Sequence, residues 1–344
     1  LPLFMPVATK LSAKLISLRE IEGMGFSTVI CNSFLLYLDP GIELIKKSGG
    51  MRRFTGTNLN FFSDSGGFQM ISDVFLEGIN EKGLKLRSPY DKKVHLITPE
   101  KSMEIQSELG GDVVMCLDYM PRYGDKKKDI ERSVELTFQW AKRCRDSYSG
   151  EGKLFGIIQG GTFKDLRKKS AELITSLDLD GYAIGGLGIG EGKDKMFSAV
   201  EDVIKLLPKN KPKYLMGIGS PDDVRKFMNL GVDIFDSAYP TRVGRHGLIF
   251  SDNGNIEIDN KKFRDDFRKI DEKCGCETCK NFSRAYLHHL VKIKEPLAKR
   301  LMSIHNLRFV LQLVETAKEH IKAGTYSSFK EQFIEKWRSS HREK

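Results

Sequence analysis

Short apolar runs alternate with amphipathic segments through most of the first 240 residues. Eight runs are typical of strands because they are apolar and rich in β-branched or aromatic side chains, at residues 3–7, 28–31, 60–62, 113–117, 154–158, 182–184, 214–216 and 232–235. Apolar positions recur at helical spacing between many of these runs, over residues 99–109, 133–146, 163–176, 196–207 and 221–230. This alternation predicts parallel β-α units, and eight strands are what a closed (β/α)8 TIM barrel requires. The predicted fold class is therefore α/β.

Residues 83–98 interrupt this rhythm. The interval between the third and fourth predicted strands is too long for one crossover, and apolar positions alternate on both sides of Pro89-Tyr90-Asp91. The pattern predicts an inserted β-hairpin. Because insertions that follow a barrel strand build its active-site face, we expect the hairpin near the site of chemistry.

After Phe250 the pattern changes to a cysteine-rich loop followed by long helices, including residues 307–323. We therefore expect two units. Residues 1–250 form the catalytic barrel, and residues 251–344 form a zinc-binding, basic helical subdomain that packs on the barrel.

The charge distribution points toward a polyanionic partner. The 344 residues carry a formal net charge of +10, and residues 251–344 hold 20 Lys and Arg against 14 Asp and Glu. Such an excess is typical of nucleic-acid binding, although a solvated helical face would also account for it. No apolar stretch is long enough to span a membrane, and the start of the chain lacks the pattern of a signal peptide.

The six cysteines are unevenly distributed. Three are scattered in apolar or helical contexts, whereas Cys274, Cys276 and Cys279 lie within six residues. This is not a disulfide framework, so we expect a cytoplasmic protein with a structural zinc ion bound to the three thiolates. Zinc needs a fourth ligand, and the spacing alone leaves His288, His289 and His305 as candidates.

Polar residues follow several of the predicted strands. They are Asn32, Asp64, Asp118, Gln159 and Asp236, accompanied by glycines at residues 66–67, 160–161, 185–186 and 217. A barrel collects its chemistry at the carboxyl ends of its strands, so these side chains should converge on one mouth. Any one aspartate is commonly an N-cap, but three together favour an active site. The glycines lack the context of a P-loop or a dinucleotide fingerprint, and instead fit close backbone approach to a flat ligand.

The residue types suit substitution at the anomeric carbon of a nucleoside. Asp64 and Asp236 could divide the roles of nucleophile and proton carrier. A carboxylate beside an amide, as Asp118 and Gln159 would be, matches the Watson–Crick edge of guanine.

Ordered motifs extend this picture along the whole chain. They are Phe4-Met5-Pro6-Val7, Asp64-Ser65-Gly66-Gly67-Phe68-Gln69, Thr98-Pro99-Glu100-Lys101-Ser102-Met103, Gln159-Gly160-Gly161, Ile184-Gly185-Gly186-Leu187, Tyr214-Leu215-Met216-Gly217, the segment from Asp236 through Arg242, and the cysteine motif with His305-Asn306-Leu307. With them the chain resembles the queuine/tRNA-guanine transglycosylase family of zinc-containing TIM-barrel enzymes.

The resemblance implies a pentosyltransferase that exchanges a guanine in tRNA for a free 7-deazaguanine. Asp236 would attack the ribose C1′ to form a covalent ribosyl-enzyme, and Asp64 would be the general acid/base. The resemblance also assigns the remaining residues: Asn32, Phe68, Asp118, Gln159, Gly186, Leu187, Met216 and Gly217 to the base site, Arg242 and Arg245 to tRNA, and His305 to zinc. A homodimer is the family expectation.

Departures from the common bacterial pattern bear on the substrate. Met120 stands where bacterial members usually carry Cys, and Leu35, Phe68 and Ser237 also differ. We expect preQ1 as the preferred base over queuine or preQ0. The segment 239–247 is similar to the bacterial and eukaryotic one, which favours the anticodon wobble position. The alternatives are an archaeosine-type enzyme using preQ0 and a non-catalytic tRNA-binding partner subunit.

Overall fold

The computed structural model describes residues 1–66, 75–252 and 254–328. Its centre is one sheet of eight strands in the order β1-β11-β10-β9-β8-β7-β3-β2. The strands are β1 (Leu3–Pro6), β2 (Thr28–Asn32), β3 (Asn60–Asp64), β7 (Val113–Met115), β8 (Lys153–Ile158), β9 (Gly181–Ile184), β10 (Lys213–Leu215) and β11 (Ile234–Ser237). All eight predicted strand positions are confirmed.

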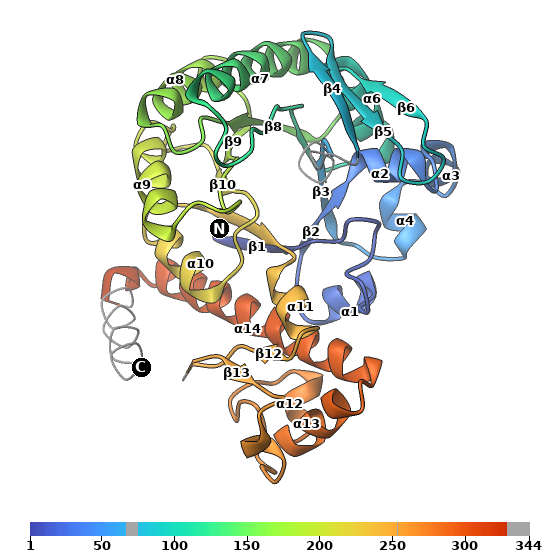
Figure 1. Cartoon of the computed structure of the whole chain (residues 1–344), viewed down its shortest axis with the longest axis vertical. Helices are drawn as coiled ribbons and strands as arrows, with labels where there is room; N and C mark the ends of the chain where they lie inside the picture. Colours follow the sequence, from blue (N-terminus) through green and yellow to red (C-terminus); the bar gives the residue numbers. More distant parts are fainter. Residues whose placement is uncertain (67–74, 253, 329–344) are drawn as a thin grey trace.

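The two edges of this sheet meet. A parallel bridge joins Val7, just after β1, to Ile30 in β2, and the Ala8 N–H donates to the Ile30 carbonyl over 2.8 Å. The sheet is therefore a nearly closed parallel barrel ringed by helices, as Figure 1 shows from one end. This confirms the predicted TIM barrel.

Large side chains fill the barrel interior. Phe62 makes edge-on contacts with Phe155 and Tyr214, at centroid distances of 5.7 and 5.9 Å. Met5, Met115 and Ile234 belong to the same buried cluster. Because the interior is packed, chemistry is confined to the ends of the strands.

Helices follow most strands on the outside of the barrel. They are α1 (Leu18–Gly23), α2 (Ser33–Leu38), α3 (Ile42–Lys47), α4 (Met51–Thr55), α6 (Pro99–Leu109), α7 (Lys127–Ser147), α8 (Lys164–Thr175), α9 (Lys193–Ile204), α10 (Pro221–Met228) and α11 (Tyr239–Gly244). Capping residues in the sequence determine where these helices begin and end. The side chain of Thr98 accepts from the Lys101 N–H at the start of α6, where Pro99 is the first helical residue, and Gly110 ends the helix in the left-handed conformation.

The predicted insertion is larger than a hairpin. Residues 83–98 form the hairpin of β5 (Gly83–Arg87) and β6 (Val94–Ile97), as expected, but β4 (Leu76–Asn80) adds a third antiparallel strand. The insertion lies against α7, where the indole N–H of Trp140 and the guanidinium of Arg143 both donate to the Glu81 carbonyl.

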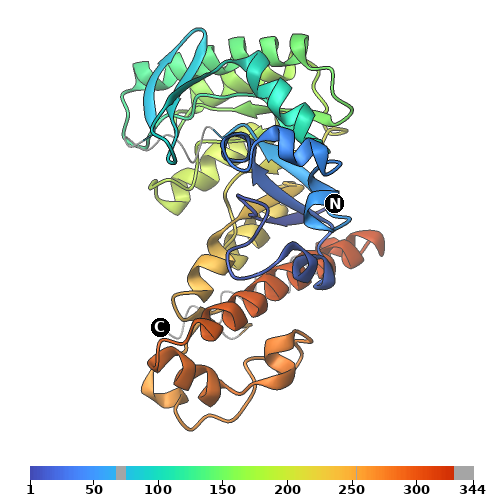
Figure 2. The same cartoon turned by 90° about the vertical axis from the view of Figure 1, so that its right-hand side faces the viewer.

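The C-terminal part contains β12 (Leu248–Ile249), β13 (Ile256–Glu257), a 3-10 turn (Lys261–Phe263), α12 (Glu277–Asn281), α13 (Arg284–Lys292) and α14 (Pro296–Lys322). The helix predicted at 307–323 is the second half of α14. β12 and β13 pair with each other across the predicted boundary at residue 250. Figure 2 shows α14 running from this part back to the barrel, where it packs on α11 and β1.

Within the described ranges, no helix has both the length and the apolar character that crossing a lipid bilayer requires.

Candidate active site and metal centre

Three buried carboxylates lie at the carboxyl ends of barrel strands. Asp64 ends β3, Asp118 follows β7 and Asp236 is the next-to-last residue of β11. Burial, and then the charges of Asp118 and Asp236, raise the pKa of Asp64 to about 7. Asp118 and Asp236 are therefore close enough to Asp64 for their charges to affect its protonation.

Asp236 is fixed through one oxygen. The phenol of Tyr214 donates to Asp236 Oδ1 over 2.6 Å, and the Gly217 N–H donates to the same oxygen over 2.7 Å. Burial raises the pKa of Asp236, and these two hydrogen bonds oppose the rise. Oδ2 accepts no hydrogen bond from the described residues, so the carboxylate is oriented but has one uncommitted oxygen.

Asp118 and Gln159 are in direct contact. Gln159 Nε2 donates to Asp118 Oδ2 over 2.7 Å. Burial raises the pKa of Asp118 to about 6, and the bond from Gln159 opposes the rise. Gln159 Oε1 is buried with no partner among the described residues. The pair thus keeps unsatisfied acceptors, and buried acceptors of this kind are costly unless a ligand uses them.

Asn32 lies beside the turn that carries Asp64. The two residues are register partners in the β2–β3 ladder, and Asn32 Oδ1 accepts from the Leu35 N–H over 2.9 Å. Gly66 has φ of +88°, and a Cβ there would lie 2.7 Å from the Cβ of Phe34. Only glycine fits this turn. Phe68, the predicted stacking residue, lies outside the described residues.

The glycines after β9 and β10 place backbone next to these polar groups. Gly186 has φ of +65°, and a Cβ there would lie 2.3 Å from Gln159 Oε1 and 3.7 Å from Met120 Cγ. The next residue, Leu187, is buried. Met216 is partly buried against the barrel interior, and Gly217 beside it is exposed with φ of +76°. Together these residues surround the ends of β7 to β10.

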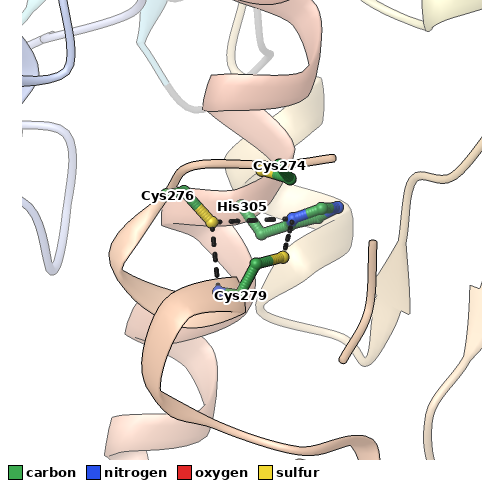
Figure 3. Close-up of side chains that lie close together, drawn as sticks. All are labelled: Cys274, Cys276, Cys279 and His305. Atoms are coloured by element: carbon green, nitrogen blue, oxygen red, sulfur yellow. Dashed lines mark hydrogen bonds between the residues drawn. The ribbon is translucent and has the colours of Figure 1, made fainter. Parts of the chain in front are cut away.

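The cysteine cluster lies in the C-terminal part, between the segment around α12 and the helix α14 (Figure 3). One ligand atom from each of Cys274, Cys276, Cys279 and His305 lies within 4.8 Å of all the others, and all four residues are buried. His305 Nδ1 is 3.2 Å from Cys279 Sγ, while Nε2 is bonded to the Phe250 carbonyl over 2.9 Å. This contact places the proton on Nε2 and leaves Nδ1 to face the thiols.

Three thiols and one imidazole form a closed, buried donor set that suits a tetrahedral metal ion. His288 does not belong to this set, because its ring nitrogens are not among the atoms that lie within 4.8 Å of one another; its Nδ1 is bonded instead to the Ile258 carbonyl over 2.8 Å. The cluster also joins two distant segments, since the cysteines lie at the start of α12 and His305 lies in α14.

Comparison with known proteins places this geometry in a family. The family described as Queuine tRNA-ribosyltransferase matches residues 1–339. A protein of that name from Caldanaerobacter subterraneus is 42% identical over 344 residues, covering 99% of this chain and 92% of its own length. The Bacillus subtilis protein of the same name is 42% identical over 338 residues, which is 98% of this chain and 89% of that protein.

The chain belongs to the queuine tRNA-ribosyltransferase family. Membership makes it a pentosyltransferase, in agreement with the resemblance drawn from its motifs. The buried group of three cysteines and His305 could hold a metal ion, which is consistent with the structural zinc of the family, and its four members are those that the resemblance selected.

One functional contact in this queuine tRNA-ribosyltransferase fold was missed from the sequence. Tyr214 was placed in a strand and in the motif Tyr214-Leu215-Met216-Gly217 but given no role in the site, yet its hydroxyl donates to Asp236. The available signal was its position two residues before Met216, on the side of β10 that faces the barrel interior.

The predicted tRNA contacts lie just after Asp236, on α11 and its end. Arg242 is exposed and lies over the Tyr239 ring at 5.8 Å, whereas Arg245 is partly buried. Burial, and then the charge of Arg242, lower the pKa of Arg245. In the described part of the chain neither arginine forms an ion pair. Two neighbouring cations without a carboxylate partner are suited to binding anions.

Proposed function

We propose that this chain replaces guanine at the wobble position of a tRNA anticodon with the 7-deazaguanine preQ1, through a covalent ribosyl-aspartyl intermediate. The observation that carries the proposal is the environment of Asp236. One of its oxygens is held by Tyr214 and Gly217, the other accepts no hydrogen bond from the described residues, and its charge contributes to the raised pKa of the buried Asp64.

In the first half-reaction, Asp236 Oδ2 bonds to the ribose C1′ as the bond from C1′ to guanine N9 breaks. The bonding electron pair leaves with the base, and Asp64 supplies the proton that neutralises it. A carboxyl group whose pKa lies near 7 can give and take a proton at neutral pH, whereas Asp236 is stabilised as the anion by two donors.

In the second half-reaction, the incoming base transfers its N9 proton to Asp64, its nitrogen attacks C1′, and the ester to Asp236 breaks. One glycosidic bond replaces another, so the exchange needs no nucleoside triphosphate. Water must be excluded from the covalent intermediate, since hydrolysis would leave an abasic tRNA.

Base selection rests on Asp118 and Gln159. The free oxygen of Asp118 would accept from guanine N1–H and the exocyclic amine, and the second N–H of Gln159 would donate to O6. Adenine would leave Asp118 unpaired, at a cost of roughly 1–3 kcal/mol. The backbone of Gly186 and Leu187 would complete the edge, with Asn32 supporting Asp64, Gly217 beside the nucleophile, and Phe68 and Met216 on the two faces of the base.

Two further features guide the choice of substrate. Met120 lies beside Gly186 and so borders the base site, where its long, flexible thioether would shape the wall next to the substituent of the 7-deazaguanine. Arg242 and Arg245 follow the nucleophile directly and would bind phosphates that flank the target nucleotide. The target base must leave its stack, which costs least in an unpaired loop such as the anticodon.

We assign zinc to the cysteine cluster, with Cys274, Cys276, Cys279 and His305 as ligands. The ion would be structural, because four protein ligands leave no open position. We also propose that the protein acts as a homodimer on tRNA in the cytoplasm, where buried free thiols remain reduced.

The decisive assay measures incorporation of radiolabelled guanine into an unmodified tRNA transcript. The wild-type chain should transfer label and, without free base, form an adduct with tRNA that survives denaturing electrophoresis. Asp236→Asn should do neither. Asp202→Asn, on the outer helix α9, is the matched control and should behave as wild type.

Equal incorporation by Asp236→Asn would refute the assigned nucleophile. A wild-type chain that binds tRNA without transferring label would favour the non-catalytic partner subunit. Preference for preQ0 over preQ1, with label entering outside the anticodon, would favour the archaeosine-type enzyme.

A further inference from the structure

Arg167 is a fully buried arginine next to the proposed base site. It lies in α8, with none of its surface exposed. Its Nε donates to the Gly161 carbonyl over 2.7 Å, Nη1 donates to the Ile158 carbonyl over 3.0 Å, and Nη2 donates to the Gly186 carbonyl over 3.4 Å. Among the described residues, no carboxylate forms an ion pair with it.

These three carbonyls belong to two different segments. Ile158 ends β8 and Gly161 lies in the loop that follows it, so the two flank Gln159 in the sequence. Gly186 lies in the loop after β9, next to Leu187. One guanidinium therefore joins the segment that carries the Gln159 amide to the segment that presents the Gly186–Leu187 backbone. The helix α8 also lies close to the loop after β8, since a Cβ on Gly160 would lie 2.7 Å from the backbone nitrogen of Arg167.

A buried cation without an acidic partner is unfavourable unless its hydrogen bonds are needed. Burial lowers the pKa of Arg167 to about 9, and the charge of Glu191 opposes that shift, so the side chain is still charged at neutral pH. The planar fork of arginine reaches three carbonyls in fixed directions, which the single ammonium of lysine cannot do. The arrangement therefore depends on arginine geometry rather than on positive charge alone.

We propose that Arg167 is a positioning residue for the free base: it sets the separation between Gln159 and the Gly186–Leu187 backbone, and thereby the fit of guanine or a 7-deazaguanine. The inference rests on the proposed function. It assigns no contact with the base and no proton transfer to Arg167. Its effect should fall more heavily on the free base than on tRNA, because tRNA has further proposed contacts, at Arg242 and Arg245, that neither segment carries.

The test compares Arg167→Met and Arg167→Lys with wild type in the guanine exchange assay, measuring KM for guanine and KM for tRNA separately. Loosening a site by a fraction of an ångström is expected to raise KM for guanine by about tenfold or more, with a clearly smaller rise in KM for tRNA. In Arg167→Ala, which removes the side chain beyond Cβ, millimolar guanidinium chloride should restore part of the loss, because the cavity then has room for the ion.

Arg225→Met is the matched control. Arg225 is another largely buried arginine, but it lies on α10 near Asp222, Asp252 and the Phe309 ring. Its substitution should lower the melting temperature without changing the ratio of the two KM values and without rescue by guanidinium.

An unchanged KM for guanine in Arg167→Met would overturn the inference, as would equal changes in both KM values that follow the loss of stability. If Arg167→Met does not fold, Arg167→Lys decides the matter by the same ratio. If the wild-type chain shows no exchange at all, the proposed function fails instead. Equilibrium dialysis with radiolabelled guanine then tests Arg167 alone, since weaker binding by the variants would still support it and equal binding would refute it.

Discussion

The hydroxyl of Tyr214 and the carboxylate of Asp236 are joined by a hydrogen bond of 2.6 Å between neighbouring barrel strands. The bond uses the same oxygen that accepts from the Gly217 N–H. Asp236 is thereby held in one orientation, and its negative charge is stabilised in a buried setting where ionisation is otherwise disfavoured.

Replacing Tyr214 with Phe removes one of the two donors and so raises the pKa of Asp236. A hydrogen bond to a charged group contributes roughly 1.5–3 kcal/mol. The acid limb of the pH profile of kcat/KM should therefore move to higher pH by about one unit or more, with a larger loss at pH 6 than at pH 8. The control is Tyr182→Phe, because the Tyr182 hydroxyl donates to the Thr175 carbonyl, away from Asp236. A profile that keeps its wild-type shape would show that the phenol does not tune Asp236.

Asp64 should destabilise the fold at neutral pH. Its pKa is raised to about 7 in the folded chain from an ordinary value of 3.8, so the folded state binds this proton more tightly than the unfolded state. Stability is then lost as pH rises from about 4 to about 7. The unfolding free energy of Asp64→Asn minus that of wild type should therefore increase by roughly 1–3 kcal/mol when the pH is raised from 5 to 8.

Chemical denaturation at the two pH values measures this difference, with Asp202→Asn, at a partly exposed position of α9, as the control. The expectation fails if the gap between Asp64→Asn and wild type is the same at pH 5 and pH 8.

The cysteine cluster should hold one zinc ion per chain. Cys276→Ala removes a ligand that lies between the loop and α14, and we expect loss of the metal together with more than about 3 kcal/mol of stability. Elemental analysis and thermal melts provide the readouts. Cys144→Ala, in α7 outside the cluster, should keep its zinc. Full metal content in Cys276→Ala would exclude this site.

Arg242 should contribute to tRNA binding through phosphate. Arg242→Ala should raise KM for tRNA several-fold, leave KM for guanine unchanged, and reduce the slope of log K against log salt by roughly 0.7. Lys205→Ala, directly after the outer helix α9, should leave the slope at its wild-type value. A wild-type slope in Arg242→Ala would remove this residue from the interface.

The barrel was predictable because parallel strands are buried on both faces. Every residue of β2 is buried, so the run is continuous and easily recognised. β4 lacks such a signal, since Leu76, Glu77 and Gly78 are all at least partly exposed and the apolar positions do not alternate. The strand exists because it pairs with β5, which is a tertiary cause that the local pattern does not contain.

The site was predictable where the fold rule alone places residues together, as with Asp64, Asp118 and Asp236 after their strands. Tyr214 was not, because a tyrosine in an apolar run has the same appearance whether it packs or donates a hydrogen bond. Spacing likewise could not choose among the three histidines. His305 faces the thiols only because α14 folds back across the cysteine loop.

The path of α14 also determines how the C-terminal part is attached to the barrel. Within a few residues of His305, the Ser303 hydroxyl donates to the Thr241 carbonyl, and the Asn306 amide donates to the carbonyls of Pro240 and Leu248. These acceptors belong to the stretch that leaves β11 directly after Asp236. The C-terminal part therefore braces the backbone that follows Asp236, and a chain truncated after Phe250 should lose the contacts that hold Pro240 and Thr241 in place.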